Sequence, residues 1–548
     1  MSFRIPVPAA ALALALAAAA PGAAQSSPSP GFTFYTQTTS TTTMMIDESG
    51  TTVHTWPSQD LPGLAVYMLE DGNILRTEHP PGAGFGAGAG GRVTEITWDG
   101  VVEWTYDYFT GGVLQHHDVE PMPNGNVLLV AWEDKTPAEA VAMGRNPTFV
   151  GPVFMPDHVV EVEPTGPTTG AIVWEWHAWD HLIQDFDPTK PNFGVVADHP
   201  ERIDINYPPG PEPTGDWLHV NSVDYNPELD QIVLSVHDFD EIWVIDHSTT
   251  TAEAAGSTGG NSGKGGDLLY RWGNPAAYDT GPAAAQVLGR QHDANWVEPG
   301  FPGEGNIVLS NNRAGGGPFN LFSSVIEIAP PVDAAGNYAL TPGTAYGPTS
   351  LVWEYTAPNP PEFFNPNQGG AVRLANGNTL VTSTNQGWLF EVNLQKQKVW
   401  EKLNAGIVFK ARRYDRNLWT DGHELSVNAG GSIDLELAAG TGHAGAAYLV
   451  LGSASGTSPG FAVDGQVLPL NPADPYFLFT LSSPGAPPLA QSIGTLDALG
   501  NATATFSLPA ASSPGLAGIV VHHAFGLLDV TTAAVLLTSN AAALELVP

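Results

Sequence analysis

The stretch Asn376-Gly377-Asn378-Thr379-Leu380 joins a tight turn to an apolar strand, and the same unit recurs along the chain. Asn and Gly tolerate positive φ, which a two-residue hairpin turn requires. Other copies begin at Asp71-Gly72-Asn73, at Asn124-Gly125-Asn126 and at Gly305-Asn306. Because short apolar runs flank each copy, the pattern predicts a series of β-hairpins.

Two more strands are expected after each hairpin. The third contains a central acidic residue, as in Val93-Thr94-Glu95-Ile96, and the fourth is aromatic, as in Val102-Glu103-Trp104. A further copy runs from Trp217 to Trp272. Four strands at a repeating interval are typical of the blades of a β-propeller. This pattern predicts five complete blades between Leu64 and Leu403.

A sixth blade is predicted to be split between distant parts of the chain. Residues 43–47 and 52–56 resemble a third and a fourth strand that lack their first pair, and residues 409–414 could supply an inner strand. Joining strands from both ends of the ring hides open sheet edges. The expected fold is therefore all-β, with a six-bladed propeller over residues 32–419. A β-sandwich-like accessory domain is expected over residues 420–548, which are rich in Ala, Gly, Ser, Thr, Leu and Val.

Composition excludes several classes of protein. A chain of 548 residues is too long for one ordinary core, and 61 glycines and 48 prolines suit strands and turns better than long helices. The net charge of -37 argues against a nucleic-acid partner, because a phosphate backbone needs a basic face. The chain has no cysteine, which excludes disulfides and thiolate chemistry.

The first residues have the features of an export signal. Arg4 precedes an apolar run over residues 9–20, and small residues precede Gln25. These features predict a signal peptide over residues 1–24, and no later stretch is a candidate membrane span. The mature protein is expected to be secreted or periplasmic. The sequence does not indicate an oligomeric state.

Three histidines share one position in successive repeats, seven residues before the hairpin turn. They are His117, His219 and His292, and the same offset falls on Leu64 in the first blade and on Gly369 in the last. This position is expected at the start of the first strand, which lines a propeller's channel. Single histidines there often only satisfy polar groups, but three in register favour a functional site. Imidazole can act as base, nucleophile or metal ligand, and the sequence does not choose among these roles.

Other candidates lie near these histidines. His116 could share or replace the role of His117, and Arg313 could bind an anion such as sulfate or point into solvent. Asp118 and Asp293 each follow a channel histidine, and strand alternation predicts that they point away from the channel. Loops rich in Asp and Asn could hold calcium, but no calcium-loop spacing occurs and no metal ligand is assigned.

Two segments resemble the aryl-sulfate sulfotransferase family, in its exported bacterial branch. The first segment is Gly215-Asp216-Trp217-Leu218-His219-Val220-Asn221-Ser222-Val223. The second is Gln291-His292-Asp293-Ala294-Asn295-Trp296, followed by Ser310-Asn311-Asn312-Arg313. The resemblance covers roughly residues 32–403. It implies an exported six-bladed propeller that passes a sulfuryl group from a phenolic sulfate ester to a phenol. The group travels on a sulfohistidine, and no nucleotide donor is needed.

The resemblance also assigns roles to individual residues. His219 and His292 match two channel histidines, and Arg313 matches an arginine that holds the sulfuryl oxygens. His116, His237, Asn221 and Trp217 are expected to contact substrate.

The nucleophilic histidine of the family falls in a region that here reads Ser383-Thr384-Asn385-Gln386-Gly387. Either His116, His117 or His237 has taken over, or the activity is lost. If the chain is a transferase, His117 or His292 is the residue expected to be sulfated.

Three functions follow from these expectations. The first is an aryl-sulfate sulfotransferase that acts on small aryl sulfates and phenols without a cofactor. The second is a non-catalytic propeller that binds a small anionic or phenolic ligand, or a glycan at the cell surface. The third is a quinone- or calcium-dependent propeller oxidoreductase or lactonase.

Overall fold

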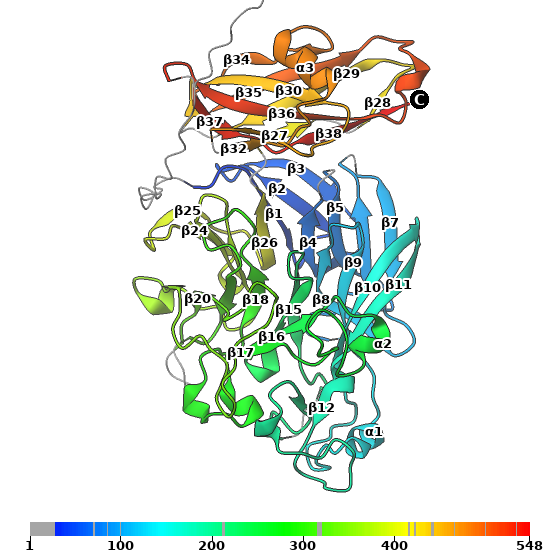
Figure 1. Ribbon diagram of the computed structural model, residues 1–548, viewed down its shortest axis with the longest axis vertical. Helices are drawn as coiled ribbons and strands as arrows, with labels where there is room; N and C mark the ends of the chain where they lie inside the picture. The colour runs from blue at the N-terminus through cyan, green and yellow to red at the C-terminus, as the bar shows by residue number, and fades with distance from the viewer. Residues whose placement is uncertain are drawn as a thin grey trace, which may run out of the picture.

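A computed structural model describes residues 28–548, except 70–71, 85, 99, 211–213, 315–320, 415–416, 421–423, 440–442, 465, 499 and 533. The predicted signal peptide therefore lies outside the described residues. Strands dominate the fold, and this confirms the all-β class. Figure 1 shows the sheets of the repeats below and those of the C-terminal segment above.

Six four-stranded antiparallel sheets contain the repeats. From the innermost strand outward, five of them are β4 (Leu61–Met68), β5 (Ile74–His79), β6 (Arg92–Ile96) and β7 (Val102–Asp107); β8 (Val113–Pro121), β9 (Val127–Glu133), β10 (Asp157–Gly166) and β11 (Thr169–His177); β14 (Val220–Asn226), β15 (Gln231–Val236), β16 (Glu241–Asp246) and β17 (Tyr270–Trp272); β18 (His292–Trp296), β19 (Ile307–Asn311), β20 (Ser324–Ile328) and β21 (Trp353–Tyr355); β22 (Gly370–Arg373), β23 (Thr379–Ser383), β24 (Trp388–Val392) and β25 (Lys398–Lys402).

The remaining sheet joins distant parts of the chain, as the sequence predicts. It runs in the order β26 (Val408–Tyr414), β1 (Phe32–Gln37), β2 (Thr42–Ile46) and β3 (Thr52–Pro57). One detail of the prediction was wrong, because residues 43–56 lack only one partner strand rather than two. Strand β1 supplies the second strand, with Phe34 opposite both Met45 and Arg412.

The innermost strands β4, β8, β14, β18, β22 and β26 contact one another in a closed cycle, which is the arrangement of a β-propeller. A tryptophan in the fourth strand of each sheet donates its indole N–H to the next sheet, in the loop between the third and fourth strands. The six pairs are Trp56–Thr97, Trp104–Thr169, Trp174–Thr249, Trp272–Pro348, Trp353–Leu394 and Trp400–Glu48. The aromatic fourth strand of the repeat therefore joins neighbouring sheets.

The acidic residue of each third strand also has a structural role. Glu95 accepts a hydrogen bond from Asn73 at 2.8 Å, so the hairpin turn is tied to the third strand. In the last sheet Glu391 accepts from Asn378 at 2.5 Å and pairs with Arg413 of β26. These glutamates link each turn to its own sheet and, in this case, to the next one.

Long insertions extend from the ring at the foot of Figure 1. They contain the helices α1 (Pro137–Ala142) and α2 (Thr251–Ala254) and a parallel pair, β12 (Leu182–Ile183) with β13 (Ile203–Asp204). His181, in the 3-10 turn η1 (Ala178–His181), ties two insertions together. It hydrogen-bonds Asp267 at 2.9 Å and the Ala254 carbonyl at 2.8 Å.

The C-terminal segment forms two larger sheets around one hydrophobic core that includes Leu435, Phe506 and Phe525. The first sheet contains β27 (Leu418–Thr420), β29 (Gly431–Ala438), β35 (Asn501–Leu508) and β33 (Leu489–Ala490). The second contains β28 (Glu424–Ser426), β38 (Ala542–Val547), β36 (Val520–Asp529), β30 (Ala447–Ser453) and β34 (Ile493–Thr495), with β37 (Ala534–Thr538) on β36. A small hairpin, β31 (Phe461–Val463) with β32 (Gln466–Leu468), and helix α3 (Pro475–Ser482) complete the segment.

Strand β27 pairs with β29, so the C-terminal sheets begin two residues before the predicted boundary at 420. Whether the two parts fold independently stays a prediction. Across the described residues, no helix is long and apolar enough to cross a membrane.

Candidate functional site

The shared position of the three histidines coincides with a bulge in the innermost strands. Leu64, His117 and His219 have φ values of 95°, 53° and 53°, and Gly369 has a φ of 104°. In β18 the residue with positive φ is Asp293, one position later, at 59°. Bulges of this kind re-aim side chains next to active sites. Holding a non-glycine residue in this region costs on the order of 1–3 kcal/mol, so the surrounding structure must enforce it.

Five histidines form a continuous arc across the tops of these strands. Ring centroids are 5.1 Å apart for His116–His117, 4.5 Å for His117–His219, 4.7 Å for His219–His237 and 5.2 Å for His237–His292. The structure thus brings together all five histidines that the sequence analysis names. We call this group the histidine arc.

The His116–His117 end of the arc is buried. The Nδ1 atoms of the two rings are 2.8 Å apart, and His116 Nε2 lies 2.7 Å from an oxygen of Asp157. The His116 ring stacks on Trp132 with centroids 4.0 Å apart. Burial holds the pKa of both histidines well below the ordinary value, so both are neutral near pH 7.

A glycine-rich loop covers this end of the arc. Alternate glycines face β8 and β9, and a Cβ on Gly86 would stand 2.7 Å from Trp132. On Gly88 a Cβ would stand 2.0 Å from the His117 ring, whose Nε2 lies against this glycine. The period-two glycine pattern of residues 84–90 is therefore explained by close approach of the loop to the arc.

The opposite end of the arc is held by hydrogen bonds at both ring nitrogens. His292 Nδ1 lies 3.0 Å from Asn312 Oδ1 and 3.1 Å from the Arg290 carbonyl. The Gln368 N–H donates to Nε2 at 3.2 Å. Because Nε2 must accept, Nδ1 carries the proton and the ring is neutral. Its lone pair is already engaged.

The centre of the arc consists of two Asp–His pairs. His219 Nδ1 is 2.5 Å from Asp216 Oδ2, and His237 Nδ1 is 2.7 Å from Asp238 Oδ1. Each aspartate fixes the proton on Nδ1, so Nε2 faces outward, and neither Nε2 has a hydrogen-bond partner among the described residues. Both side chains are 15% exposed, unlike the sealed ends of the arc.

A cation lies beside these two pairs. Arg290 Nη1 forms an ion pair with Asp238 and lies 3.3 Å from His237 Nδ1. The Arg290 side chain is 37% exposed, so the guanidinium can also meet an anion from solvent.

The two central histidines have pKa values that diverge. Burial by itself lowers the pKa of His219, but the hydrogen bond and charge of Asp216 outweigh it, and the net pKa is raised. Burial lowers the pKa of His237 well below the ordinary value, and the positive charges of His219, Arg290 and Arg313 lower it further. Neighbouring titratable groups with separated pKa values are the usual basis of an acid and base assignment.

The other predicted site residues lie around the arc. Arg313 is exposed, and its backbone N–H donates to the Gly289 carbonyl at 2.9 Å. Asn221 is buried and donates to the Gln291 carbonyl at 2.8 Å, and Trp217 is buried and donates to the Tyr207 carbonyl at 2.7 Å. Asn221 and Trp217 thus support the strands that carry histidines.

The expected direction of Asp118 and Asp293 was wrong. Both are buried where the innermost strands meet, and both pair with Lys410 of β26, while Asp293 also pairs with Arg412 at 2.7 Å. Strict alternation fails because His117 and Asp293 have positive φ, which rotates the side chains that follow. The closing strand therefore neutralises the carboxylates next to two histidines.

Three groups of the site were missed by sequence reasoning as functional residues. Asp216 lies three residues before His219, and Asp238 directly follows His237, so both could have been found as local Asp–His pairs. Arg290 has no such signal, because its partner Asp238 lies in another sheet. No group of three His, Asp or Glu side chains within the described ranges is arranged to hold a metal ion.

Comparisons with solved structures show only distant similarity. A luciferin-regenerating enzyme is 9% identical with a TM-score of 0.29, covering 67% of this chain and 81% of its own. A Kuenenia stuttgartiensis hydrazine synthase is 9% identical with a TM-score of 0.33, covering 68% and 75%. A Dos1 propeller is 9% identical with a TM-score of 0.29, covering 67% and 68%. No curated protein matches the chain.

A family model, however, matches more than half of the chain. It is described as arylsulfotransferase (ASST) and matches residues 20–300, a range that includes all five histidines, both Asp–His pairs and Arg290. This agrees with the resemblance seen in the Asp216–Val223 and Gln291–Trp296 segments. The chain therefore belongs to the arylsulfotransferase family.

Proposed function

We propose that the protein transfers a sulfuryl group from a phenolic sulfate ester to a phenol, with His237 as the residue that carries the group. The observation that supports this most directly is the pair of partly exposed central histidines. Each has Nδ1 held by an aspartate, and their pKa values are shifted in opposite directions.

In the first step the lone pair of neutral His237 Nε2 attacks sulfur. The bond between sulfur and the aryl oxygen breaks, and its electron pair stays on that oxygen. Protonated His219 gives its Nε2 proton to the departing oxygen, so a phenol leaves and a sulfohistidine remains. Arg290 stabilises the sulfuryl oxygens, which gain negative charge in the transition state.

In the second step the roles reverse. Neutral His219 takes the proton of the acceptor phenol as its oxygen attacks sulfur. The bond between sulfur and His237 nitrogen breaks, and its electron pair returns to Nε2. Both histidines regain their starting protonation, so the cycle balances without a cofactor.

His237 fits the nucleophilic role better than the two histidines expected to be sulfated. His292 uses both ring nitrogens, and His117 is buried under Gly88. His237 also has the position that the family's nucleophile would have in a late blade. It follows β15 and opens a 3-10 turn that ends at left-handed Asp240, just as Thr384 follows β23 and opens a turn that ends at left-handed Gly387.

Export belongs to the same proposal. The N-terminal features predicted from Arg4 and the apolar run over residues 9–20 would place the enzyme in the periplasm or outside the cell. A nucleotide sulfate donor is scarce there, which suits transfer between phenols.

The test is to incubate the exported protein with 4-methylumbelliferyl sulfate and a phenol, without nucleotide, and to map the sulfated peptide by mass spectrometry. We expect the label on His237, and His237→Ala should abolish both label and turnover. Arg290→Met should slow turnover by about two to three powers of ten, the usual effect of losing one charge-stabilising donor.

Arg313→Met is the matched control for the arginine, because its side chain is exposed and charged but lies outside the Asp–His pairs. A larger effect of Arg313→Met than of Arg290→Met would return the anion-binding role to Arg313. If no aryl sulfate gives a sulfohistidine or releases a phenol, the protein is instead a binding propeller.

A further inference from the structure

A second candidate site lies in the insertions, apart from the histidine arc. A pocket of about 480 Å³ is formed by the segment after β11, the segment after α1 and the segment between β16 and β17. Its size is within the roughly 300–1,000 Å³ typical of small-molecule sites. It shares no residue with the arc, and we call it the insertion pocket.

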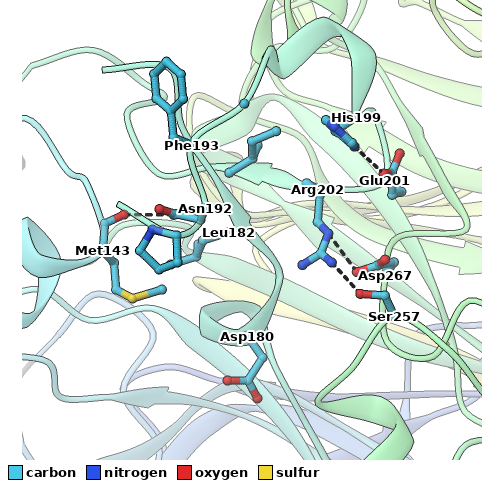
Figure 2. Close-up of a pocket in the computed structure, with 13 residues that line it drawn as sticks. Met143, Asp180, Leu182, Asn192, Phe193, His199, Glu201, Arg202, Ser257 and Asp267 are labelled. Carbon is cyan, nitrogen blue, oxygen red and sulfur yellow. Dashed lines mark hydrogen bonds and ion pairs between the residues drawn. The ribbon is translucent and has the colours of Figure 1, made fainter. Parts of the chain in front are cut away.

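The two sides of the insertion pocket differ in character. Figure 2 shows Met143, Leu182 and Phe193 on one side and the charged groups of Glu201 and Arg202 on the other. The Phe193 side chain is 46% exposed, which is unusual for a large apolar residue at the edge of a pocket. A ligand with a flat apolar body would cover it.

Arg202 is held in place as a hydrogen-bond donor. Its Nε lies 3.2 Å from Asp267 Oδ1, and its Nη2 donates to Ser257. Asp267 is itself fixed by the buried His181 at 2.9 Å. Nη1 of Arg202 has no hydrogen-bond partner among the described residues, so one oriented donor is left for a ligand.

The charges around the pocket disfavour an anion. Carboxylates of Asp180, Glu201 and Asp267 line it against the single guanidinium of Arg202, which Asp267 already neutralises. Asp180 is exposed and makes no hydrogen bond with the described part of the chain, and Glu201 uses only Oε1, on His199 at 2.9 Å. These carboxylate oxygens can accept from a hydroxyl group.

We propose that the insertion pocket binds an uncharged phenol. The ring would lie against Phe193 and Leu182, the phenolic oxygen would accept from Arg202 Nη1, and the hydroxyl would donate to a carboxylate. The sulfate ester of the same phenol would be rejected, because it adds negative charge and loses the donor. The argument uses only the lining of this pocket and does not depend on chemistry at the histidine arc.

The test is calorimetric titration of the full chain carrying His237→Ala with 2-naphthol and, separately, with 2-naphthyl sulfate. We expect 2-naphthol to bind and its sulfate to bind at least about tenfold more weakly, as one charged group placed beside carboxylates would cause. Phe193→Ala should weaken 2-naphthol binding roughly tenfold through loss of ring contact. Arg202→Met should weaken it as well.

Phe186→Ala is the matched control, because Phe186 lies in the same insertion and is 49% exposed but does not line the pocket. It should leave binding unchanged. Absence of 2-naphthol binding, equal binding of the sulfate, or equal effects of Phe186→Ala and Phe193→Ala would each overturn the proposal. None of these results depends on whether sulfohistidine forms, so this proposal and the transferase proposal can fail separately.

Discussion

The indole N–H of Trp400 donates to the carbonyl oxygen of Glu48 at 2.6 Å, although 352 positions separate the two residues in the chain. It is the sixth of six equivalent contacts, and it joins the last sheet of the repeats to the first. The ring is therefore closed by the same joint that connects its consecutive sheets.

Trp400→Phe should lower the free energy of unfolding by about 1 kcal/mol, the usual net value of one hydrogen bond. Trp56→Phe, which breaks the equivalent contact to Thr97, should have a similar effect. Urea unfolding followed by circular dichroism measures both. A loss seen for only one of the two variants would contradict the equivalence of the joints.

The pH dependence of turnover should report the two central histidines. The proposed first step needs protonated His219 and neutral His237. The rate should therefore fall as pH rises through the raised pKa of His219, and fall again as pH drops through the lowered pKa of His237. Asp216→Asn removes the charge that raises the pKa of His219, so the alkaline limb should move down by about one pH unit or more.

The pH–rate profile with phenyl sulfate tests this expectation, because its leaving oxygen needs a proton. The control substrate is 4-nitrophenyl sulfate, whose leaving group departs readily as an anion and should show a weaker alkaline limb. If Asp216→Asn leaves the alkaline limb with phenyl sulfate in place, His219 is not the acid.

The glycine-rich loop provides a test of how the buried end of the arc is held. Gly88→Ala should displace the His117 ring, because the new Cβ would stand 2.0 Å from it, and turnover should fall. Gly82→Ala is a matched control, since both glycines have a φ of 92° but nothing lies within 4 Å of a Cβ on Gly82. Similar losses of activity in the two variants would assign the effect to backbone strain rather than to contact with His117.

The buried charges of the closing strand should matter more than exposed ones. Lys410→Met leaves Asp118 buried without its ammonium partner and should lower the free energy of unfolding by about 3–5 kcal/mol. Lys398→Met breaks an ion pair with Glu401 whose side chains are 39% and 38% exposed, and should change it by less than about 0.5 kcal/mol. Equal unfolding midpoints for the two variants would rule out a stabilising role for Lys410.

Much of the fold followed from local sequence, and the exceptions have physical reasons. Hairpin turns such as Asn376-Gly377 and the aromatic fourth strands are local signals, and they located most of the strands. Strand β1 was missed because its turn to β2, over residues 38–41, contains no Asn-Gly or Asp-Gly pair.

The site was predictable only in part. The common offset of His117, His219 and His292 predicted a shared location, since equivalent strand positions meet near the axis. Side-chain direction at Asp118 and Asp293 was not predictable, because the positive φ values that rotate them depend on packing between sheets. The pairing of Arg290 with Asp238 across two sheets likewise has no local signature.

Strand β26 gives the molecule a dependence on the order of synthesis. A ribosome makes Lys410 and Arg412 after every other strand of the ring, yet these two residues neutralise the carboxylates beside His117 and His292. A nascent or proteolysed chain that ends before Val408 therefore has two uncompensated carboxylates where its histidine-bearing strands must meet. We expect such fragments to be inactive and to be recognised as unfolded by cellular proteases, so that only a chain translated past this strand displays the histidine arc.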